Sequence, residues 1–534
     1  MSKVALISVY NKDGIVNFAQ ELIEMGWKIL ASGGTAKVLK EAGILVTDVA
    51  DFVGGGPILG HRVVTLSREV HAGLLAQYDD ADLEELENLE LSPIDLVCVD
   101  LYPLQEEINK PESTTMSVIE KTDIGGPTML RSAAKGRRIV ICNFEQREQV
   151  LDWLKEGEPD KDAFITNLAA EAEFLVSQYC LASAKYHSQN TFNGILGKKV
   201  LTCKYGENGV QAPAFLYSEE TADPLGLDKF VLKSGSLPSY NNMCDIERLL
   251  QTITHIAAGF DVNYGKIPFI AIAVKHGNAC GAAIGINQTE VLQKMIQGDT
   301  RAIFGGLVMT NFSIDEALAE VLLTYQMDTG RRLLDGIIAP SFTDEAVEML
   351  RRKGDKCRFL SNENLLHLSR NSLDSTPRFR YVRGGFLFQP NYTFVIDFND
   401  HHIEKVGLEI NDQQKADLIL AWAIGCTSNS NTITLVLNGM LLGNAVGQQD
   451  RVGSANLAIT RALSAGHQTQ NAVAYSDSFF PFTDGIETLI IAGIKAILAS
   501  SGSVKDGDVK KCCVNNDVAL FMIPDSEGRG FYGH

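Results

Sequence analysis

The sequence predicts an α/β protein of two domains, and three observations lead to this fold class. Apolar runs that suit strands alternate with stretches of helical spacing along most of the chain, as in sheets covered by helices on both faces. The 534 residues exceed the usual size of one domain. A polar, glycine-containing segment without periodicity, 186–204, interrupts the alternation, so we expect domains at 1–197 and 198–534.

The first domain shows this alternation most clearly, and a mostly parallel sheet is expected there. Its predicted strands are 4–7, 28–31, 44–49, 95–99 and 138–142, and its predicted helices are 13–25, 36–42 and 163–186.

In the second domain, the predicted strands are 269–275, 304–310, 336–339 and 432–437, and the predicted helices are 288–297, 344–352 and 414–424. A charged stretch near 355–378 is expected to be poor in strands. Predicted strands and helices alternate in a similar way in 198–375 and in 376–534. This similarity suggests two related α/β halves, although no clear sequence repeat emerges.

Composition narrows the range of partners. The formal net charge of −19 argues against nucleic acid as the main partner. No apolar run approaches the roughly 20 residues that span a bilayer, and the N-terminus does not resemble a secretory signal. The ten cysteines include no C-x2-C pair, so we expect reduced thiols, no structural zinc site and a cytoplasmic protein.

Ser32-Gly33-Gly34-Thr35 follows a predicted strand and opens a predicted helix. Glycines let a ligand approach the backbone, and the free N–H groups at a helix start attract anions. The two hydroxyl side chains add further donors. A phosphate site and a plain tight turn explain this stretch about equally well.

A second candidate site is Asp123-Ile124-Gly125-Gly126-Pro127, which precedes Lys135. Asp123 can accept a proton while Lys135 stabilises an oxyanion. From the residues alone, an N-cap aspartate followed by a solvated helical lysine is the simpler interpretation.

Lys275-His276 ends a predicted strand and enters a glycine-containing turn that runs to Gly281. Active sites of α/β sheets lie at the carboxyl ends of strands. Histidine exchanges protons near neutral pH, and a neighbouring cation can bind a carbonyl oxygen. The dipeptide alone nevertheless fits a solvated strand end better than a catalytic pair.

Two ordered series of motifs carry a resemblance to one enzyme family. The first domain contains A-S-G-G-T-A, R-V-x-T-L, H-A-G-x-L-A, L-Y-P, D-I-G-G and R-x-A-A-K, and the second contains S-Y-N-N, V-K-H-G, F-G-G, D-G-I-I-A-P and S-D-x-F-F-P-F-x-D. These motifs resemble the IMP cyclohydrolase and AICAR transformylase parts of the bifunctional purine biosynthesis family PurH. The resemblance implies a methylglyoxal-synthase-like parallel-sheet domain followed by two cytidine-deaminase-like α/β halves.

The resemblance also implies roles for individual residues. In the second domain, His276 would relay a proton, Lys275 would stabilise the formyl oxyanion and Asn431 would orient the formyl oxygen. Ring closure in the first domain is expected of Tyr102, Asp123 and Lys135. Substrate binding is expected of Lys12, Ser32, Gly33, Gly34, Thr35, Arg62 and Thr65 in the first domain, and of Lys204, Tyr205, Asn242, Gly305, Asp335, Phe480 and Arg529 in the second.

Several positions depart from the family pattern. Val64 stands where the family has a catalytic lysine, and Ser67-Arg68 replaces His-Pro. Asp100 replaces an asparagine before L-Y-P, and Val210 replaces a histidine. Loss of one oxyanion donor costs roughly 100- to 1000-fold in rate, but ring closure is intramolecular and needs less assistance.

The implied reaction is formyl transfer from 10-formyltetrahydrofolate to AICAR, giving FAICAR, followed by ring closure to IMP. A transformylase whose first domain is weakened or inactive, and a nucleotide-binding paralogue, remain alternatives. The family also leads us to expect a homodimer with sites at its interface, no metal other than a monovalent cation, and no nucleic-acid or membrane partner.

Overall fold

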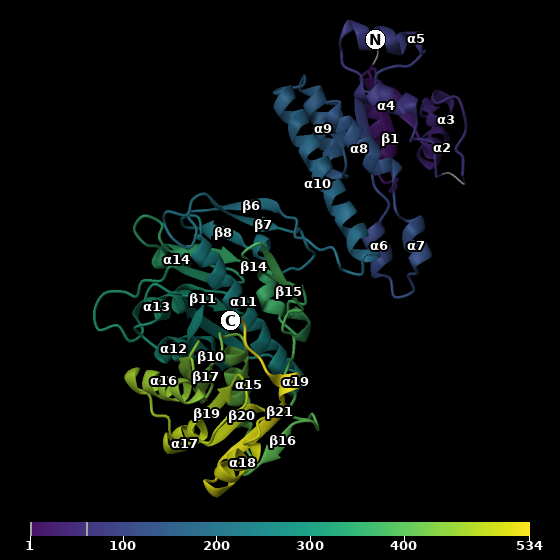
Figure 1. The fold of residues 1–534 in the computed structure, drawn as a ribbon. Coiled ribbons are helices and arrows are strands. Elements are labelled where there is room, and N and C mark those ends of the chain that lie inside the picture. The colour runs from purple at the N-terminus through teal and green to yellow at the C-terminus, as the bar shows by residue number, and fades with distance from the viewer. Residues whose placement is uncertain (1–2, 60–61, 534) are drawn as a thin grey trace. The chain divides into compact units, whose positions relative to one another are not determined.

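The computed structural model describes residues 3–59 and 62–533 and divides into two compact units, Met1–Leu196 and Gly197–His534 (Figure 1). Each unit has a sheet and hydrophobic clusters of its own. Within the described ranges, no helix is long and apolar enough to cross a membrane.

A five-stranded parallel sheet, ordered β3-β2-β1-β4-β5, forms the centre of the first unit. Successive residues of β1 face opposite sides: Ala5 and Ile7 join one buried cluster, and Val4 and Leu6 join another. Both faces of the sheet are therefore covered, as expected for parallel strands.

The strands of this unit are β1 (Val4–Ser8), β2 (Lys28–Ala31), β3 (Val46–Asp48), β4 (Leu96–Val99) and β5 (Ile139–Ile141). Its helices are α1 (Ile15–Glu24), α2 (Gly33–Glu41), α3 (Val49–Phe52), α4 (Arg68–Leu75), α5 (Asp80–Asn88), α6 (Leu104–Asn109), α7 (Thr115–Glu120), α8 (Gly125–Lys135), α9 (Glu145–Lys155) and α10 (Lys161–His187). The predicted strands and helices of this part are confirmed, with small differences at their ends.

The second unit is built on a 12-stranded sheet, ordered β16-β21-β20-β19-β17-β18-β10-β9-β11-β12-β13-β8. Its first half contains β8 (Val231–Ser234), α11 (Tyr240–Tyr264), β9 (Phe269–Lys275), β10 (Asn278–Gly285), α12 (Gln288–Gly298), β11 (Leu307–Thr310), α13 (Glu316–Thr324), β12 (Gly336–Ala339), α14 (Asp344–Leu350) and β13 (Arg358–Ser361).

The second half contains β16 (Glu404–Val406), α15 (Asp412–Cys426), β17 (Ile433–Leu437), β18 (Met440–Ala445), α16 (Arg451–Ser464), β19 (Val473–Ser476), α17 (Asp484–Ile491), β20 (Ala496–Ser501), α18 (Asp506–Asn515), β21 (Ala519–Pro524) and α19 (Asp525–Gly528). Two hairpins, β6–β7 (Lys198–Cys203 and Ala214–Ser218) and β14–β15 (Arg378–Val382 and Gly385–Gln389), form separate small sheets.

The two halves repeat the same path through the sheet. Strands β10 and β18 meet at its centre, and the remaining strands follow in matching order on either side. Helices α11 and α15 pack together on one face, while α12–α14 and α16–α18 cover the other. A β-carbon at Gly281 would lie 2.2 Å from the Met295 carbonyl oxygen, and one at Gly443 would lie 2.2 Å from that of Ala458. Each half thus packs one strand closely onto its following helix.

The structure adds detail to one sequence-based prediction for this unit and corrects another. The stretch 355–378 is poor in strands, as predicted, but it does contain β13, because Phe359 and Leu360 are buried between β12 and β8 despite their charged flanks. The turn after His276 is shorter than expected, because β10 begins at Asn278 and pairs antiparallel with β9.

Candidate functional site

Lys275 and His276 lie at a two-residue hairpin turn between β9 and β10. His276 and Gly277 have φ angles of 53° and 72°, the left-handed values that the tightest hairpins require at both central residues. The Gly277 N–H donates to Asp245 Oδ1 on α11 at 2.6 Å. Lys275 Nζ donates to the Phe304 carbonyl oxygen at 2.7 Å. Helix α11 and the segment before β11 therefore hold the turn that presents both side chains.

Asp245 links this turn to a second carboxylate. Burial raises the pKa of Asp245, the nearby His276 opposes that rise, and the negative charge of Asp335 adds to it. Asp335 itself pairs with Arg352. Asp245, His276 and Asp335 therefore form one group of interacting side chains.

Strand register places Asn431 at the same edge of the sheet as Lys275. Strand β10 runs away from the Lys275 turn, and β18 returns antiparallel to it, with Ala283 opposite Met440. Strand β17 is the antiparallel neighbour of β18 and begins where β18 ends. Adjacent strands lie about 4.8 Å apart, so the turn and the start of β17 are separated by roughly 10 Å.

At this edge of the sheet some strands end and others begin. Strands β19, β20 and β21 end here, whereas β11 and β12 begin here because β11 runs antiparallel to β9. Lys275 lies at the carboxyl end of β9, as expected, whereas β11 and β12 contribute their amino ends to this edge. Gly305 and Asp335 reach the edge because each lies just before one of these two strands.

Asn431 is fixed by hydrogen bonds on both sides of its amide. Its Nδ2 donates to the Gln448 carbonyl oxygen at 2.9 Å, and its Oδ1 accepts from Arg451 Nη2 at 2.8 Å. Arg451 also forms a buried ion pair with Asp477. The side chain of Asn431 therefore has one preset orientation.

The N-terminus of α11 gathers three residues that were predicted to bind the nucleotide. The Asn242 N–H donates to Ser239 Oγ at 3.2 Å, and the Ser239 N–H donates to Asn242 Oδ1 at 3.0 Å. The Tyr205 carbonyl oxygen accepts from the Tyr240 N–H at 3.0 Å, which places Lys204 and Tyr205 beside the helix start. The positive end of this 25-residue helix and the Lys204 ammonium both suit a phosphate.

The remaining predicted residues of this site differ in exposure. Gly305 lies in the turn before β11 and donates its N–H to the Leu333 carbonyl oxygen at 2.7 Å. Arg529 pairs with Asp525 at 3.6 Å and stays 48% exposed. Phe480 is only 2% exposed and belongs to a hydrophobic cluster. A substrate therefore cannot reach the Phe480 ring without a rearrangement, whereas Arg529 is partly open to solvent.

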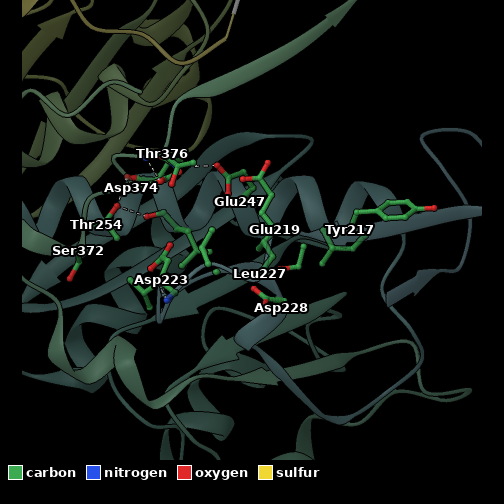
Figure 2. Close-up of a pocket in the computed structure, with 17 residues that line it drawn as sticks. Tyr217, Glu219, Asp223, Leu227, Asp228, Glu247, Thr254, Ser372, Asp374 and Thr376 are labelled. Carbon is green, nitrogen blue, oxygen red and sulfur yellow. Dashed lines mark hydrogen bonds between the residues drawn. The ribbon is translucent and has the colours of Figure 1, made fainter. Parts of the chain in front are cut away.

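A separate cavity of about 310 Å³ lies beside α11 (Figure 2). Its lining includes five carboxylates, which are Glu219, Asp223, Asp228, Glu247 and Asp374. Because such a lining repels anions, this cavity does not suit a nucleotide phosphate. Lys275 and His276 are not among the residues that line it.

In the first unit, the end of β1 and the start of α2 form a candidate anion site. The Val9 N–H donates to Thr35 Oγ1 at 3.2 Å, and the hydroxyls of Ser8 and Ser32 are 2.7 Å apart. Nothing lies within 4 Å of the β-carbon positions of Gly33-Gly34. A ligand can therefore approach the free N–H groups of α2 closely.

Lys12 lies beside this helix start together with a buried ion pair. Its Nζ donates to the carbonyl oxygens of Val9 and Tyr10, and burial lowers its pKa. Asp100 Oδ2 is 2.9 Å from Arg147 Nη2, and these side chains are 19% and 6% exposed. Burial raises the pKa of Asp100, which the Arg147 charge opposes. Arg147 thereby neutralises a carboxylate close to Lys12.

The three residues predicted for ring closure share one region. Asp123 Oδ1 accepts from the Gly126 N–H at 2.9 Å in the first turn of α8, although Ile124, and not Asp123 as the simpler interpretation predicted, is the N-cap residue of this helix. Asp123 and Lys135 also line one cavity of about 750 Å³. Burial raises the pKa of Asp123, and burial together with the Asp123 charge raises that of Tyr102.

The segment with the departures from the family pattern adjoins this region. A β-carbon at Gly125 would lie 2.6 Å from Thr65 Oγ1, so Thr65 contacts the start of α8. Val64 packs against a hydrophobic cluster. Arg62 is largely exposed and pairs with Glu120 at 2.9 Å.

The sequence analysis did not predict the aspartate that holds the Lys275-His276 turn by a hydrogen bond. Asp245 grips this turn, and Asp417 on α15 grips the equivalent turn of the second half, accepting from the N–H groups of Asn438 and Gly439 at 2.8 and 2.6 Å. The signal was present in the sequence, because glycines recur at 277, 281 and 285 and again at 439, 443 and 447. Aligning these glycines would have paired the two turns.

Fold and site geometry together define an enzyme-like chain in which a small parallel-sheet domain precedes a duplicated α/β domain. A family model described as "MGS-like domain" matches residues 14–128, and one described as "AICARFT/IMPCHase bienzyme" matches residues 133–461. The chain belongs to the AICARFT/IMPCHase bienzyme family.

Curated relatives match the chain along almost all of its length. The "Bifunctional purine biosynthesis protein PurH" of Nostoc punctiforme is 34% identical over 539 residues, and that of Anoxybacillus flavithermus is 36% identical over 537 residues. Each alignment covers 98% of both chains. A crystal structure of ForH is 31% identical, with a TM-score of 0.33, and covers 36% of this chain and 100% of its own.

Proposed function

We propose that this protein transfers a formyl group from 10-formyltetrahydrofolate to AICAR and then closes the product, FAICAR, to IMP. Relatives that match 98% of the chain are named bifunctional purine biosynthesis proteins, and models of both parts of the family match in order. The observation that carries the proposal is the shared sheet edge of the Lys275-His276 turn and Asn431.

In formyl transfer, the AICAR amine attacks the formyl carbon, and the bond from that carbon to the folate nitrogen breaks. His276 accepts the proton that the amine loses, and such help is typically worth roughly 100- to 10,000-fold in rate. The folate nitrogen takes up a proton as it leaves. Lys275 stabilises the oxyanion, and Asn431, held by Arg451, orients the formyl oxygen.

Ring closure joins the carboxamide nitrogen of FAICAR to the formyl carbon and releases the formyl oxygen as water. Asp123, whose pKa burial raises, suits proton acceptance from this nitrogen. Lys135 and Tyr102 stabilise and protonate the departing oxygen. Val64 supplies no charge, but the two reacting groups belong to the same molecule, so little entropy is lost in bringing them together.

Substrate binding divides between the two units. In the first, Lys12, the Ser32–Thr35 turn, Arg62 and Thr65 hold the nucleotide. In the second, the start of α11 with Lys204, Tyr205 and Asn242 binds the phosphate, aided by Arg529, while Gly305 and Asp335 bound the site. The family resemblance further supports a cytoplasmic homodimer with transformylase sites at its interface and a bound monovalent cation.

Formyl transfer is tested by supplying AICAR and 10-formyltetrahydrofolate to His276→Ala. We expect its turnover to fall roughly 100- to 10,000-fold with folding intact by circular dichroism. His367→Ala is the matched control, because His367 is also exposed and lies outside the site. Undiminished turnover in His276→Ala would refute the role. AICAR binding without tetrahydrofolate release by the wild type would instead favour a nucleotide-binding paralogue.

A further inference from the structure

Three metal-binding side chains meet at the outer end of the second unit's sheet, and a fourth contacts one of them. Asp400, His401 and His402 lie in the turn before β16, with one ligand atom of each within 4.8 Å of the others. Glu527 on α19 approaches the same group, and its Oε2 is 3.2 Å from His402 Nδ1. None of these residues belongs to the motifs or to the sites described above.

The spacing of the ligand atoms suits one zinc ion. Zinc binds imidazole nitrogen and carboxylate oxygen at about 2.0–2.2 Å, which places tetrahedral ligand atoms about 3.3–3.5 Å apart. Asp400 Oδ1 is 3.5 Å from His401 Nδ1 and 3.8 Å from His402 Nδ1. An ion between them therefore requires only small side-chain shifts. Two imidazoles also favour zinc over magnesium or calcium, which prefer oxygen ligands alone.

The backbone on both sides of the cluster is firmly held. Asp400 Oδ1 accepts from the His402 N–H at 2.9 Å, which turns this carboxylate toward the rings. Phe398 and Ile403, on either side of the turn, are buried. Strand β16 pairs antiparallel with β21, so α19, which follows β21, emerges beside the turn.

The ligand side chains remain reachable from solvent. Their exposed fractions run from 36% for Asp400 to 87% for His401, so an ion can enter without opening the fold. Without a metal, the contact of His402 with Glu527 is an exposed hydrogen bond at the surface, and exposed polar contacts of this kind add little stability. One carboxylate and two imidazoles whose ligand atoms lie within 4.8 Å of one another, with Glu527 against His402, are better explained by a shared cation.

We infer that Asp400, His401, His402 and Glu527 form a zinc site that ties α19 to the turn before β16. Glu527 lies two residues before Arg529, and Asp525 at the start of α19 already accepts from Ser500 Oγ at 2.6 Å. A bound ion therefore orders the segment that carries Arg529. The consequence for nucleotide affinity rests on the proposed function; the metal site itself does not.

Isothermal titration of the reduced full-length protein with Zn²⁺ tests the site directly. We expect one tight site per chain, with affinity lowered by about 100-fold or more in His402→Ala and in Glu527→Ala, since even the loss of groups that merely support ligands costs 10- to 100-fold. His367→Ala, an exposed histidine outside the cluster, should bind as the wild type does. Circular dichroism checks that each variant folds.

Thiols are the competing ligands, because Cys180 and Cys244 are exposed. Loading with Co²⁺ separates the two cases, since only thiolate ligation adds strong near-ultraviolet charge-transfer absorption. Wild-type affinity in both cluster variants, or such a thiolate band in the Co²⁺ protein, would overturn the site.

The link to the nucleotide has its own readout. We expect Zn²⁺ to lower the KM for AICAR without changing kcat, and Glu527→Ala to abolish this effect. Zinc bound at the cluster with no change in KM would overturn the link but leave the site standing. A protein without formyl transfer would refute the proposed function, while the titration would still decide the metal site.

Discussion

At the scale of single residues, the buried pair of Asp100 and Arg147 shows how one substitution is compensated by another side chain. Asp100 puts a charge where the family pattern has a neutral amide, and Arg147 meets it with two hydrogen bonds at 2.9 and 3.1 Å. The Lys12 ammonium can therefore bind an anionic ligand instead of pairing with the Asp100 carboxylate. Sequence alone could not predict the pair, because its members are 47 positions apart and follow no local pattern.

Removing Arg147 should destabilise the first unit. In Arg147→Ala the carboxylate of Asp100 stays buried without a counter-charge, which typically costs about 3–5 kcal/mol in free energy of unfolding. Urea denaturation measures the loss. The double variant Asp100→Asn/Arg147→Met, which removes both charges, should recover most of the stability. A single variant as stable as the wild type would contradict this account of the pair.

The same variant should show a defined pH dependence. A carboxyl group whose pKa is higher in the folded than in the unfolded state binds more protons when folded, so stability falls as pH rises from about 4 through the folded pKa. Burial raises the pKa of Asp100, and loss of Arg147 raises it further. The deficit of Arg147→Ala should therefore shrink toward acid pH, as urea midpoints from pH 4 to 8 would reveal.

Asp123 should set the acid limb of ring closure. Its unprotonated form accepts the proton, so the rate falls as pH drops through its pKa, which burial holds above the ordinary value. With FAICAR as substrate, the rate should fall at a higher pH than an exposed aspartate would give. Asp123→Asn should remove most activity at every pH. A profile that stays flat down to pH 4 would contradict this role.

At the scale of elements, the sheet repeats one hairpin in both halves. Turns at His276-Gly277 and at Asn438-Gly439 share positive φ angles, and each is gripped by an aspartate from the preceding helix. Only the first turn carries Lys-His. Hydrophobic periodicity predicted β9, β11, β12 and β17 of this 12-stranded sheet and the helices α12, α14 and α15. It missed the other strands, among them β13, whose burial comes from neighbouring strands, and the glycine spacing that pairs the hairpins.

Close packing of the two hairpins makes their glycines sensitive to one added methyl group. Gly281→Ala and Gly443→Ala would each place a carbon 2.2 Å from a helix carbonyl oxygen, so each should lose about 1–3 kcal/mol or more in free energy of unfolding. Gly507→Ala is the control, because nothing lies within 4 Å of its β-carbon position and α18 should gain slightly from alanine. Thermal or urea unfolding compares the three. Equal stability of all three would refute the packing argument.

At the scale of the whole molecule, family motifs predicted which residues matter, and register explains how those of the second unit meet. Motif order alone could not bring Lys275 and Asn431 together, because antiparallel pairing of β10 with β18 sets their common edge. Nor could it assign Phe480 to the buried core. Which side chains are buried, and which atoms they contact, depends on the folded chain rather than on the order of residues within a motif.

One chain is proposed to carry out both formyl transfer and ring closure. The most direct measurement supplies purified wild-type protein with AICAR and 10-formyltetrahydrofolate and follows the nucleotides by chromatography. We expect IMP to accumulate in step with tetrahydrofolate, with FAICAR only transient. If FAICAR accumulates and closes to IMP no faster than it does without enzyme, the first unit, with Val64 in place of lysine, is not a cyclohydrolase. That result would contradict the proposal that one chain catalyses both steps.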